Sequence, residues 1–450
     1  MVTLNRPLRI AMLSYRSKPH CGGQGVYVRH LSRELDALGH YVEVFSGQPY
    51  PELDPGPRLS ELPSLDLYRD DDPFRTPGLS EYRDWADVLE TAMMWGGAFP
   101  EPLTFSIRAL RALRARAADF DVVHDNQGLG YGMLGVRRLG LPLVTSIHHP
   151  ISVDKRIELA SASWLGALNR RRWYGFVRMQ ARVARRVAAT GSLITVSESA
   201  KRDICRDFAV PPDRVHIIPL GVDTRVFRPR EAARVPGRII AVASADSAMK
   251  GVATLLRAVG KVATDRDVHL VVIGKPAPAT ERLAAQLSLT DRITFTHGLD
   301  DEAFSALLAS AEIAVVPSLY EGFSLPAVEH MASGTPLVAS NTGALPEVTG
   351  DAAVLVTPGE DEELATVLRR LHDSPAERAA LADRALARVR EQFAWSAVAR
   401  ATVEQYLAAG AAGGPALAAG AAGGPALAAG AAGGPAPAAG AGSAAAEAAC

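Results

Sequence analysis

The chain has few cysteines, no long apolar run near its start and no excess of charge of either sign. Its three cysteines, Cys21, Cys205 and Cys450, lie far apart in 450 residues, which excludes a disulfide framework and a CxxC zinc site. The apolar stretch Leu8–Leu13 is too short for a signal peptide or a membrane span. We therefore expect a cytoplasmic protein.

The charges almost balance, with 48 Lys and Arg against 49 Asp and Glu. A protein that binds nucleic acid usually carries a basic excess, so the composition gives no reason to expect such a partner. Hydrophobic residues at 48% and charged residues at 22% are values of an ordinary globular protein. The length predicts two or three domains.

The C-terminal end is a low-complexity repeat. The unit LAAGAAGGPA begins at residues 407, 417 and 427 and then decays toward the end of the chain. One Leu and no aromatic residue per unit cannot bury enough apolar area to offset the entropy of ordering. We expect residues 409–450 to form a disordered tail outside the fold.

The rest of the chain alternates short apolar runs with amphipathic segments, which is typical of parallel α/β units. The strands expected in the first half are Leu8–Tyr15, Tyr41–Ser46, Val122–Asn126, Leu143–His148, Leu193–Ser197 and Val215–Pro219. Those in the second half are Arg238–Ala243, Val268–Ile273, Ile293–Thr296, Ile313–Pro317 and Pro336–Ala339. Two such series predict two doubly wound, Rossmann-like domains, at residues 1–220 and 221–390.

In doubly wound sheets, ligands bind beyond the carboxyl ends of the strands. After the first strand come Gly22 and Gly23, at the start of a helix where a backbone could approach an anion. The segment does not match the GxGxxG dinucleotide fingerprint. A plain tight turn between strand and helix explains these glycines equally well.

The most informative segment is PSLYEGFSLPAVEHMASGTPLVAS at residues 317–340. Glu321 is expected to end a strand and enter a loop, and Glu329 follows on the next helix. Gly322 and Ser324 precede that helix, whose free N–H groups attract phosphate. The two carboxylates can accept hydrogen bonds from sugar and ribose hydroxyls. The surrounding residues are apolar and small, which argues against Glu329 being a free surface charge.

This segment resembles the signature of the retaining family 4 glycosyltransferases of GT-B fold, in an actinobacterial-like form. The resemblance extends to NTGALPEV (341–348), PLGVDTRVF (219–227), GGQGVYVRHLSREL (22–35) and the triplet at 249–251. It covers nearly everything before the tail. It implies two Rossmann-like domains facing a central cleft, the first for the acceptor and the second for the nucleotide sugar. A C-terminal helix at 391–408 would return to the first domain.

The resemblance also implies roles for individual residues. His148, Lys250 and Glu321 would be catalytic. Because His149 follows directly, the catalytic histidine of the family could correspond to either residue of this pair. Lys250 would neutralise the diphosphate, and Glu329 would bind the ribose. The residues implied to bind the donor are Gly22, Gly23, Lys250, His297, Gly298, Glu321, Gly322, Phe323, Ser324, Leu325 and Glu329.

The chain departs from the family pattern before Lys250. Relatives carry an Arg a few residues earlier, whereas this chain reads ASADSAMK at 243–250, with Asp246 and no Arg. Either another Arg reaches the diphosphate, or donor affinity depends more on Lys250 and helix dipoles.

An arginine-rich segment carries no Asp or Glu from residue 159 to residue 197. It holds Arg170, Arg171, Arg172, Arg178, Arg182, Arg185 and Arg186, with aromatic residues between them. One long basic amphipathic helix lying on an anionic membrane at 165–187 would fit. So would a helix whose aromatics pack inward while its arginines are solvated. As a third reading, Arg171, Arg172 and Asn126 would contact the acceptor.

The function implied is transfer of a sugar from a UDP- or GDP-sugar to an acceptor hydroxyl of a lipid, a glycan or a small metabolite. No DxD-like motif follows a strand of the first domain, so we expect neither a metal nor another cofactor. A GT-B sugar-nucleotide epimerase and a non-catalytic module that binds sugar nucleotides are the alternatives. A phosphorylase-like enzyme would need a much longer chain and a pyridoxal-phosphate lysine.

Overall fold

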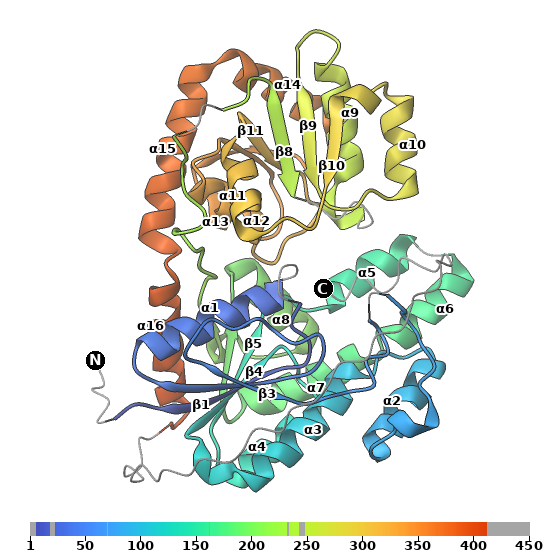
Figure 1. Ribbon diagram of the computed structural model, residues 1–450, viewed down its shortest axis with the longest axis vertical. Helices are drawn as coiled ribbons and strands as arrows, with labels where there is room; N and C mark the ends of the chain where they lie inside the picture. Colours follow the sequence, from blue (N-terminus) through green and yellow to red (C-terminus); the bar gives the residue numbers. More distant parts are fainter. Residues whose placement is uncertain are drawn as a thin grey trace, which may run out of the picture.

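The computed structural model describes residues 6–18, 23–69, 71–161, 163–231, 234–242 and 248–411. They form two domains, each built on a parallel sheet (Figure 1). The first sheet has the order β3-β2-β1-β4-β5-β6-β7. Its strands are β1 (Arg9–Ser14), β2 (Tyr41–Ser46), β3 (Arg58–Glu61), β4 (Val122–Asn126), β5 (Leu143–Ile147), β6 (Ser192–Thr195) and β7 (Val215–Ile217).

The second sheet has the order β10-β9-β8-β11-β12-β13. Its strands are β8 (Arg238–Val242), β9 (His269–Ile273), β10 (Ile293–Thr296), β11 (Ile313–Val316), β12 (Leu337–Ser340) and β13 (Ala353–Val356). In both sheets the strand order reverses beside the first strand of the domain, β1 or β8. This is the doubly wound pattern that the alternation of apolar runs predicted.

Helices cover both faces of each sheet, which explains why β4, β5, β6, β11 and β12 are buried along their whole length. The first domain contains α1 (Gly23–Ala37), α2 (Trp85–Trp95), α3 (Glu101–Ala115), α4 (Met133–Val136), α5 (Ser152–Ser161), α6 (Trp164–Trp173), α7 (Phe176–Ala188) and α8 (Glu198–Phe208). The second contains α9 (Val252–Val262), α10 (Pro278–Gln286), α11 (Asp301–Ala309), α12 (Leu325–Ala332), α13 (Leu345–Thr349), α14 (Asp361–Asp373) and α15 (Pro375–Gln392).

The last helix, α16 (Trp395–Ala408), returns to the first domain. Figure 1 shows α15 descending along the second domain and α16 continuing beside α1. Within α16, Tyr406 is buried and its hydroxyl lies 2.7 Å from His124 Nδ1 on β4. The helix therefore packs as a structural part of a domain whose other elements lie far earlier in the sequence.

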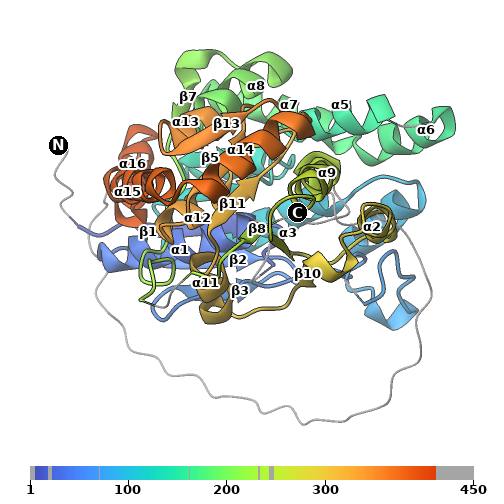
Figure 2. The same cartoon turned by 90° about the horizontal axis from the view of Figure 1, so that it is seen from above.

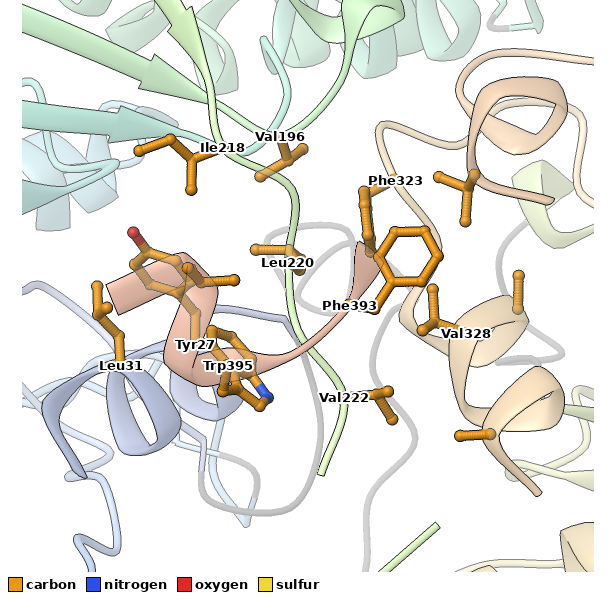
Figure 3. Packing of buried hydrophobic residues seen from close by; sticks show 14 of the residues in the cluster. Tyr27, Leu31, Val196, Ile218, Leu220, Val222, Phe323, Val328, Phe393 and Trp395 are labelled. Carbon is orange, nitrogen blue, oxygen red and sulfur yellow. The ribbon is translucent and has the colours of Figure 1, made fainter. Parts of the chain in front are cut away.

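The chain crosses between the domains twice, and the two crossings lie side by side. Val222 N–H donates to the carbonyl of Phe393 at 2.9 Å, and Val222 and Ala394 form a parallel bridge. Trp395 packs on this pair, leaving no room for a side chain at Gly221, where a Cβ would lie 2.6 Å from the Trp395 ring. Figure 3 shows the apolar cluster around the crossings, which draws residues from both domains.

The structure corrects the expectation of one long basic helix. Residues 152–188 form three helices, α5, α6 and α7, and α5 and α6 extend away from the rest of the domain (Figure 2). Tyr174 and Phe176 are buried, and Trp173 packs on Phe99 and Tyr68. The aromatic residues after α6 therefore belong to the core of the domain. Within the described part of the chain, no helix is long and apolar enough to cross a membrane.

Candidate active site between the two domains

Glu321 lies in the loop after β11, which ends earlier than expected, at Val316. The carboxylate of Glu321 accepts hydrogen bonds from Lys250 Nζ at 2.8 Å and from Ser318 Oγ at 2.7 Å. Its backbone carbonyl accepts from Ala344 N–H at 2.9 Å. The loop is thus held on both sides, and Lys250 and Glu321 form one ion pair at the carboxyl edge of the second sheet.

Lys250 owes its position to a close approach of backbone to backbone. It ends a short 3-10 turn, Ala248–Lys250, and Met249 accepts the Leu319 N–H at 2.7 Å. Gly251 follows with φ 66°, and a Cβ there would lie 2.0 Å from the Pro317 carbonyl oxygen. Only glycine combines that dihedral angle with that contact. The sequence Lys-Gly therefore places the ammonium group against the Glu321 loop.

The segment after Glu321 leads into α12. Ser324 has φ 88°, and its hydroxyl caps the helix by accepting from Ala327 N–H at 3.4 Å. Among the described residues, no acceptor binds the backbone N–H groups of Phe323, Ser324 and Leu325. Free N–H groups at a helix N-terminus form an anion-binding site. This donor loop, residues 321–325, lies next to the Lys250 ammonium group.

Glu329 lies on α12 and is partly exposed. Burial raises the pKa of its carboxyl to about 8, and the negative charge of Asp301 adds to the increase. In the described ranges, no side chain or backbone group hydrogen-bonds to this carboxyl. An acid that lacks partners in the free protein can accept hydroxyl groups from a ligand.

His148 and His149 follow β5 in the first domain and are distinguished by their partners. His148 Nε2 lies 2.7 Å from Asn126 Oδ1, while its Nδ1 is buried without a partner in the described chain. Burial, helped by the neighbouring histidines, lowers the pKa of His148 to about 3, so the ring is neutral. Although burial opposes charge on His149, its bond to Asp154 at 2.9 Å raises the pKa of that ring.

The two domains meet at Gly322. A Cβ on this residue would lie 2.7 Å from His149 Cβ and 3.0 Å from the His148 carbonyl oxygen. A Cβ on Gly23, the first residue of α1, would lie 4.0 Å from Leu325 Cδ1. The structure thus brings Gly23, His148, Lys250 and the donor loop together. Gly22 and Asp246 lie outside the described residues.

Other residues singled out in the sequence lie apart from this group or have a different environment. His297 and Gly298 follow β10 and are exposed, and Gly298 has φ 68°. Arg171 and Arg172 are exposed at the end of α6, and no contact within the described chain joins them to the donor loop.

Asn126, expected to contact the acceptor, is fully buried in the free protein. Its side chain bonds to His148 Nε2 at 2.7 Å and to Ser14 Oγ at 3.4 Å. The amide therefore contacts the His148 ring. Within the described ranges, no three His, Cys, Asp or Glu side chains lie in an arrangement that could hold a metal ion.

Sequence reasoning missed the contacts of α8 with the second domain. Ser197, which caps α8, donates from Oγ to the Gly322 carbonyl at 2.6 Å. The Glu347 carboxylate accepts the N–H groups of Glu198 and Ser199, each at 2.9 Å, and Tyr320 OH donates to Asp203 at 2.7 Å. The only signal in the sequence was Ser-Glu at a helix start, which identifies a cap but not a partner from another domain.

Comparison with known proteins agrees with this architecture. The family model described as glycosyl transferases group 1 matches residues 223–388, and that of glycosyltransferase family 4 matches residues 21–226. The chain is 57% identical to the MMP alpha-(1->4)-mannosyltransferase of Mycolicibacterium hassiacum, over 89% of this chain and 98% of that protein. It is 28% identical to the D-inositol 3-phosphate glycosyltransferase of Streptomyces coelicolor, over 90% and 93% of the two chains.

Solved structures show the same fold at lower identity. Sucrose-phosphate synthase from Thermosynechococcus elongatus superposes with a TM-score of 0.67 at 22% identity, over 89% of this chain and 98% of that one. WaaG, a glycosyltransferase involved in lipopolysaccharide biosynthesis, gives a TM-score of 0.62 at 18% identity, over 87% and 98%. The two family matches, the mannosyltransferase relative and the shared architecture lead to one conclusion: the chain belongs to the family 4 glycosyltransferases of GT-B fold.

Proposed function

We propose that this glycosyltransferase moves a mannosyl group from a nucleoside diphosphate mannose to a hydroxyl group of a glycan acceptor, forming an α-(1→4) linkage with retention of configuration. The observation that carries the choice of sugar and linkage is the 57% identity to a protein named as an α-(1→4)-mannosyltransferase, over nearly the whole length of both. The choice of donor class is supported by the free N–H groups before α12, which lie beside Lys250 and ahead of Glu329.

Each residue has a distinct part in the proposed reaction. The Lys250 ammonium group and the N-terminus of α12 stabilise the negative charge that grows on the departing diphosphate. Glu329 accepts the ribose hydroxyls. Glu321, fixed by Lys250 and Ser318, accepts hydroxyls of the transferred sugar. Because Lys250 already supplies positive charge at the phosphates, we expect neither a metal nor another cofactor to be required.

The retention of configuration is proposed to occur by substitution on one face of the sugar. Glu321 is engaged with a cation and a hydroxyl group, which makes it a poor nucleophile. His148 is neutral and remains so at any working pH, because the pKa of its ring is about 3, so it is a poor general base. The leaving phosphate oxygen then accepts the proton of the attacking hydroxyl as the bond between phosphate and sugar breaks.

The test is a transfer assay with GDP-mannose, UDP-glucose and UDP-N-acetylglucosamine, using a short mannose oligosaccharide as acceptor. We expect product only from the mannose donor, with an α-anomeric signal by nuclear magnetic resonance. Lys250→Ala should lower kcat/KM by on the order of 10²–10³-fold. Lys261→Ala is the matched control, because Lys261 pairs with Asp361 and Glu362 on another face and its loss should not change turnover.

The same assay separates the alternatives. Conversion of the donor sugar to its epimer, without transfer, would identify an epimerase. Donor binding in calorimetry with neither transfer nor hydrolysis would identify a binding module. Transfer from UDP-glucose in preference to GDP-mannose would contradict the mannosyl assignment while retaining the glycosyltransferase reaction.

A second proposal concerns an arginine face formed by Arg171, Arg172, Arg178, Arg182, Arg185 and Arg186. All six are exposed, and none pairs with a carboxylate in the described part of the chain. Trp164 on the neighbouring stretch of α6 is 78% exposed. Exposed cations without carboxylate partners, on a segment that also carries an exposed aromatic ring, suit peripheral contact with the anionic inner face of a membrane.

Sedimentation with vesicles tests the arginine face. We expect the protein to bind vesicles that contain phosphatidylserine and not vesicles of phosphatidylcholine alone. The double variant Arg185→Glu, Arg186→Glu should lose this binding without losing transfer to a soluble acceptor. Equal binding to both kinds of vesicle, or none to either, would contradict the proposal.

A further inference from the structure

The carbonyl of Gly322 in the donor loop is bound by a residue of the other domain. Ser197 Oγ–H donates to this carbonyl oxygen at 2.6 Å, and the same Oγ accepts the Ala200 N–H at 2.9 Å. The hydroxyl group therefore joins the two domains: its one proton is donated to the second domain, while a lone pair caps α8 of the first. Ser197 is 3% exposed, so water does not compete for these bonds.

The direction of this bond has a consequence for the next residue. In a trans peptide the carbonyl and the following N–H point in opposite directions. When Ser197 holds the Gly322 carbonyl on one side, the Phe323 N–H must point to the other. That N–H has no acceptor among the described residues and belongs to the donor loop beside Lys250. Ser197 thus determines where one of the anion-binding groups points.

The first domain also contacts Gly322 directly. A methyl group there would collide with His149 Cβ at 2.7 Å and with the His148 carbonyl oxygen at 3.0 Å. The backbone at His148 and the hydroxyl of Ser197 therefore both touch this one peptide. A rotation of the Gly322–Phe323 peptide would break the bond between its carbonyl and Ser197.

Three further hydrogen bonds join α8 to the second domain. Glu347 places its carboxylate on the free N–H groups of Glu198 and Ser199 at the start of α8, where the helix dipole favours a negative charge. Tyr320, next to Glu321, donates its hydroxyl to Asp203 on the same helix. These three bonds and the Ser197 bond form only when the domains meet, and each of the four ends on α8 or its cap.

We propose that Ser197 is a positioning residue for glycosyl transfer, through which the first domain orders the donor loop of the second. Its hydroxyl group aims the Phe323 N–H at the donor once the domains have closed. The inference rests on the proposed function, because the loop must be the donor site for the orientation to matter. It assigns to the first domain a part in donor activation beyond acceptor binding.

The experiment must separate this role from the capping of α8. Ser197→Gly removes the hydroxyl group, and the change is a mild one for the cap because glycine is also a favoured N-cap residue. Ser197→Thr keeps both hydrogen bonds of the hydroxyl group and should therefore retain turnover. Ser163→Gly is the matched control, because Ser163 caps α6 far from the donor loop by accepting from Gly166 N–H.

With the sugar nucleotide that the wild type uses, we expect Ser197→Gly to lower kcat by about 10–100-fold. This loss is smaller than the roughly 10²–10³-fold loss seen when a hydrogen-bond donor to the transition state is removed outright. The Kd for GDP and for UDP should rise by a smaller factor than kcat falls, since Lys250 and the other N–H groups before α12 still bind the diphosphate. Ser197→Thr should regain most of the turnover. Unchanged kcat in Ser197→Gly, or an equal loss in Ser163→Gly, would overturn the inference.

Hydrogen exchange provides a readout that does not depend on turnover. In the presence of GDP or UDP, amides of the donor loop should exchange faster in Ser197→Gly than in the wild type. If the wild type transfers no sugar from any donor, the proposed function fails. The exchange data alone then decide whether Ser197 orders the loop at residues 321–325. Equal exchange in both proteins would then refute it.

Discussion

Single side chains in this molecule take their chemical character from burial and from one or two partners. The carboxyl groups of Glu321 and Glu329 are on neighbouring elements, yet one is bound to Lys250 and the other has no partner in the described chain. His148 and His149 are adjacent, and their pKa values move in opposite directions because only His149 has a carboxylate partner. Adjacent residues of the same type therefore have different expected roles.

His148 is expected to matter more for turnover than for donor binding. The proposed place of its ring and carbonyl is beside the reacting carbon, where positive charge develops only in the transition state. His148→Ala should therefore lower kcat by on the order of 10²–10⁴-fold and change donor KM less. Steady-state kinetics measures both constants.

His149→Ala is the control for the histidine pair. Its ring binds Asp154, so its loss should weaken the start of α5 and affect turnover less than the loss of His148. A complete loss of turnover in His149→Ala, beside near-normal His148→Ala, would transfer the role to His149.

Glu329 should make nucleotide binding depend on pH. The pKa of this carboxyl is raised from 4.5 to about 8, so the free protein holds it protonated at neutral pH. Ribose hydroxyls donate to the ionised form, and binding must then release the proton. The affinity for GDP or UDP should rise with pH up to about 8 and level off above it.

Calorimetry in buffers of different ionisation enthalpy would count the proton released on binding. Glu329→Gln should bind more weakly, and its affinity should lack this pH dependence. A wild-type affinity that is constant on both sides of pH 8, with no proton released, would contradict the assignment of Glu329 to the ribose.

At the level of helices and strands, the sequence predicted an element correctly where the pattern of apolar residues within that element is clear. The periods of apolar residues placed β2, β4 and β10 at their observed bounds. They missed the short edge strands β3 and β13, whose residues are largely exposed or half-buried and lack a continuous apolar run. They also merged α6 and α7, because the break at Tyr174 and Gly175 depends on a tyrosine that turns into the core.

For the candidate site, the sequence predicted motifs but not the partners that come from distant parts of the chain. Lys250, Glu321 and Glu329 stood out through motif residues. Ser197 did not stand out, and the contact of Asn126 with His148 was not predicted, because folding alone brings Ser197 next to Gly322 and Asn126 next to His148. An N-cap serine looks the same in a sequence whether its proton goes to solvent or to a second domain.

A substitution at Gly251 tests whether the turn before it places Lys250. Gly251→Ala must pay about 1–2 kcal/mol for a positive φ and must also displace the Pro317 carbonyl, 2.0 Å from the new methyl group. The displacement would move Lys250 from Glu321. We expect a lower free energy of unfolding in urea and a lower kcat.

Gly359→Ala controls for the dihedral angle alone. Gly359 has φ 83°, and a Cβ there would meet nothing within 4 Å. This variant should lose stability but keep full turnover. If both variants behave alike, the close contact with Pro317 has no part in placing Lys250.

At the scale of the whole molecule, the two domains are joined by paired chain crossings and by α16. The crossings at Val222 and Ala394 form a single parallel bridge. The contacts of the first domain with the loop around Gly322 come instead from α8 and its cap. Chain connection and closing contacts therefore lie on different elements, and either can be altered by mutation without the other.

Truncation tests how far the fold extends toward the repeat. Ala411 is 4% exposed, belongs to the apolar cluster around the crossings and donates its N–H to the Tyr406 carbonyl at 3.0 Å. Ending the chain after Ala411 should therefore leave the melting temperature and kcat unchanged. Ending it after Leu407 should lower the melting temperature, because the C-terminal turn of α16 loses these contacts.

Differential scanning calorimetry of the two truncated proteins would distinguish the outcomes. A large drop on removal of residues 412–450 alone would contradict the expectation that the low-complexity repeat lies outside the fold. Equal melting temperatures for both proteins would instead show that Ala408–Ala411 contribute nothing to stability.

The return of α16 to the first domain has a consequence for biosynthesis. A ribosome completes β1–β7 early, but the helix that covers α1 and bonds to His124 through Tyr406 leaves the exit tunnel after the whole second domain. Until then the nascent first domain exposes the apolar surface that Trp395 and Tyr406 will cover. Folding of the first domain is thus finished only after the second domain has been synthesised, and its newly made surface must be kept from aggregating until then.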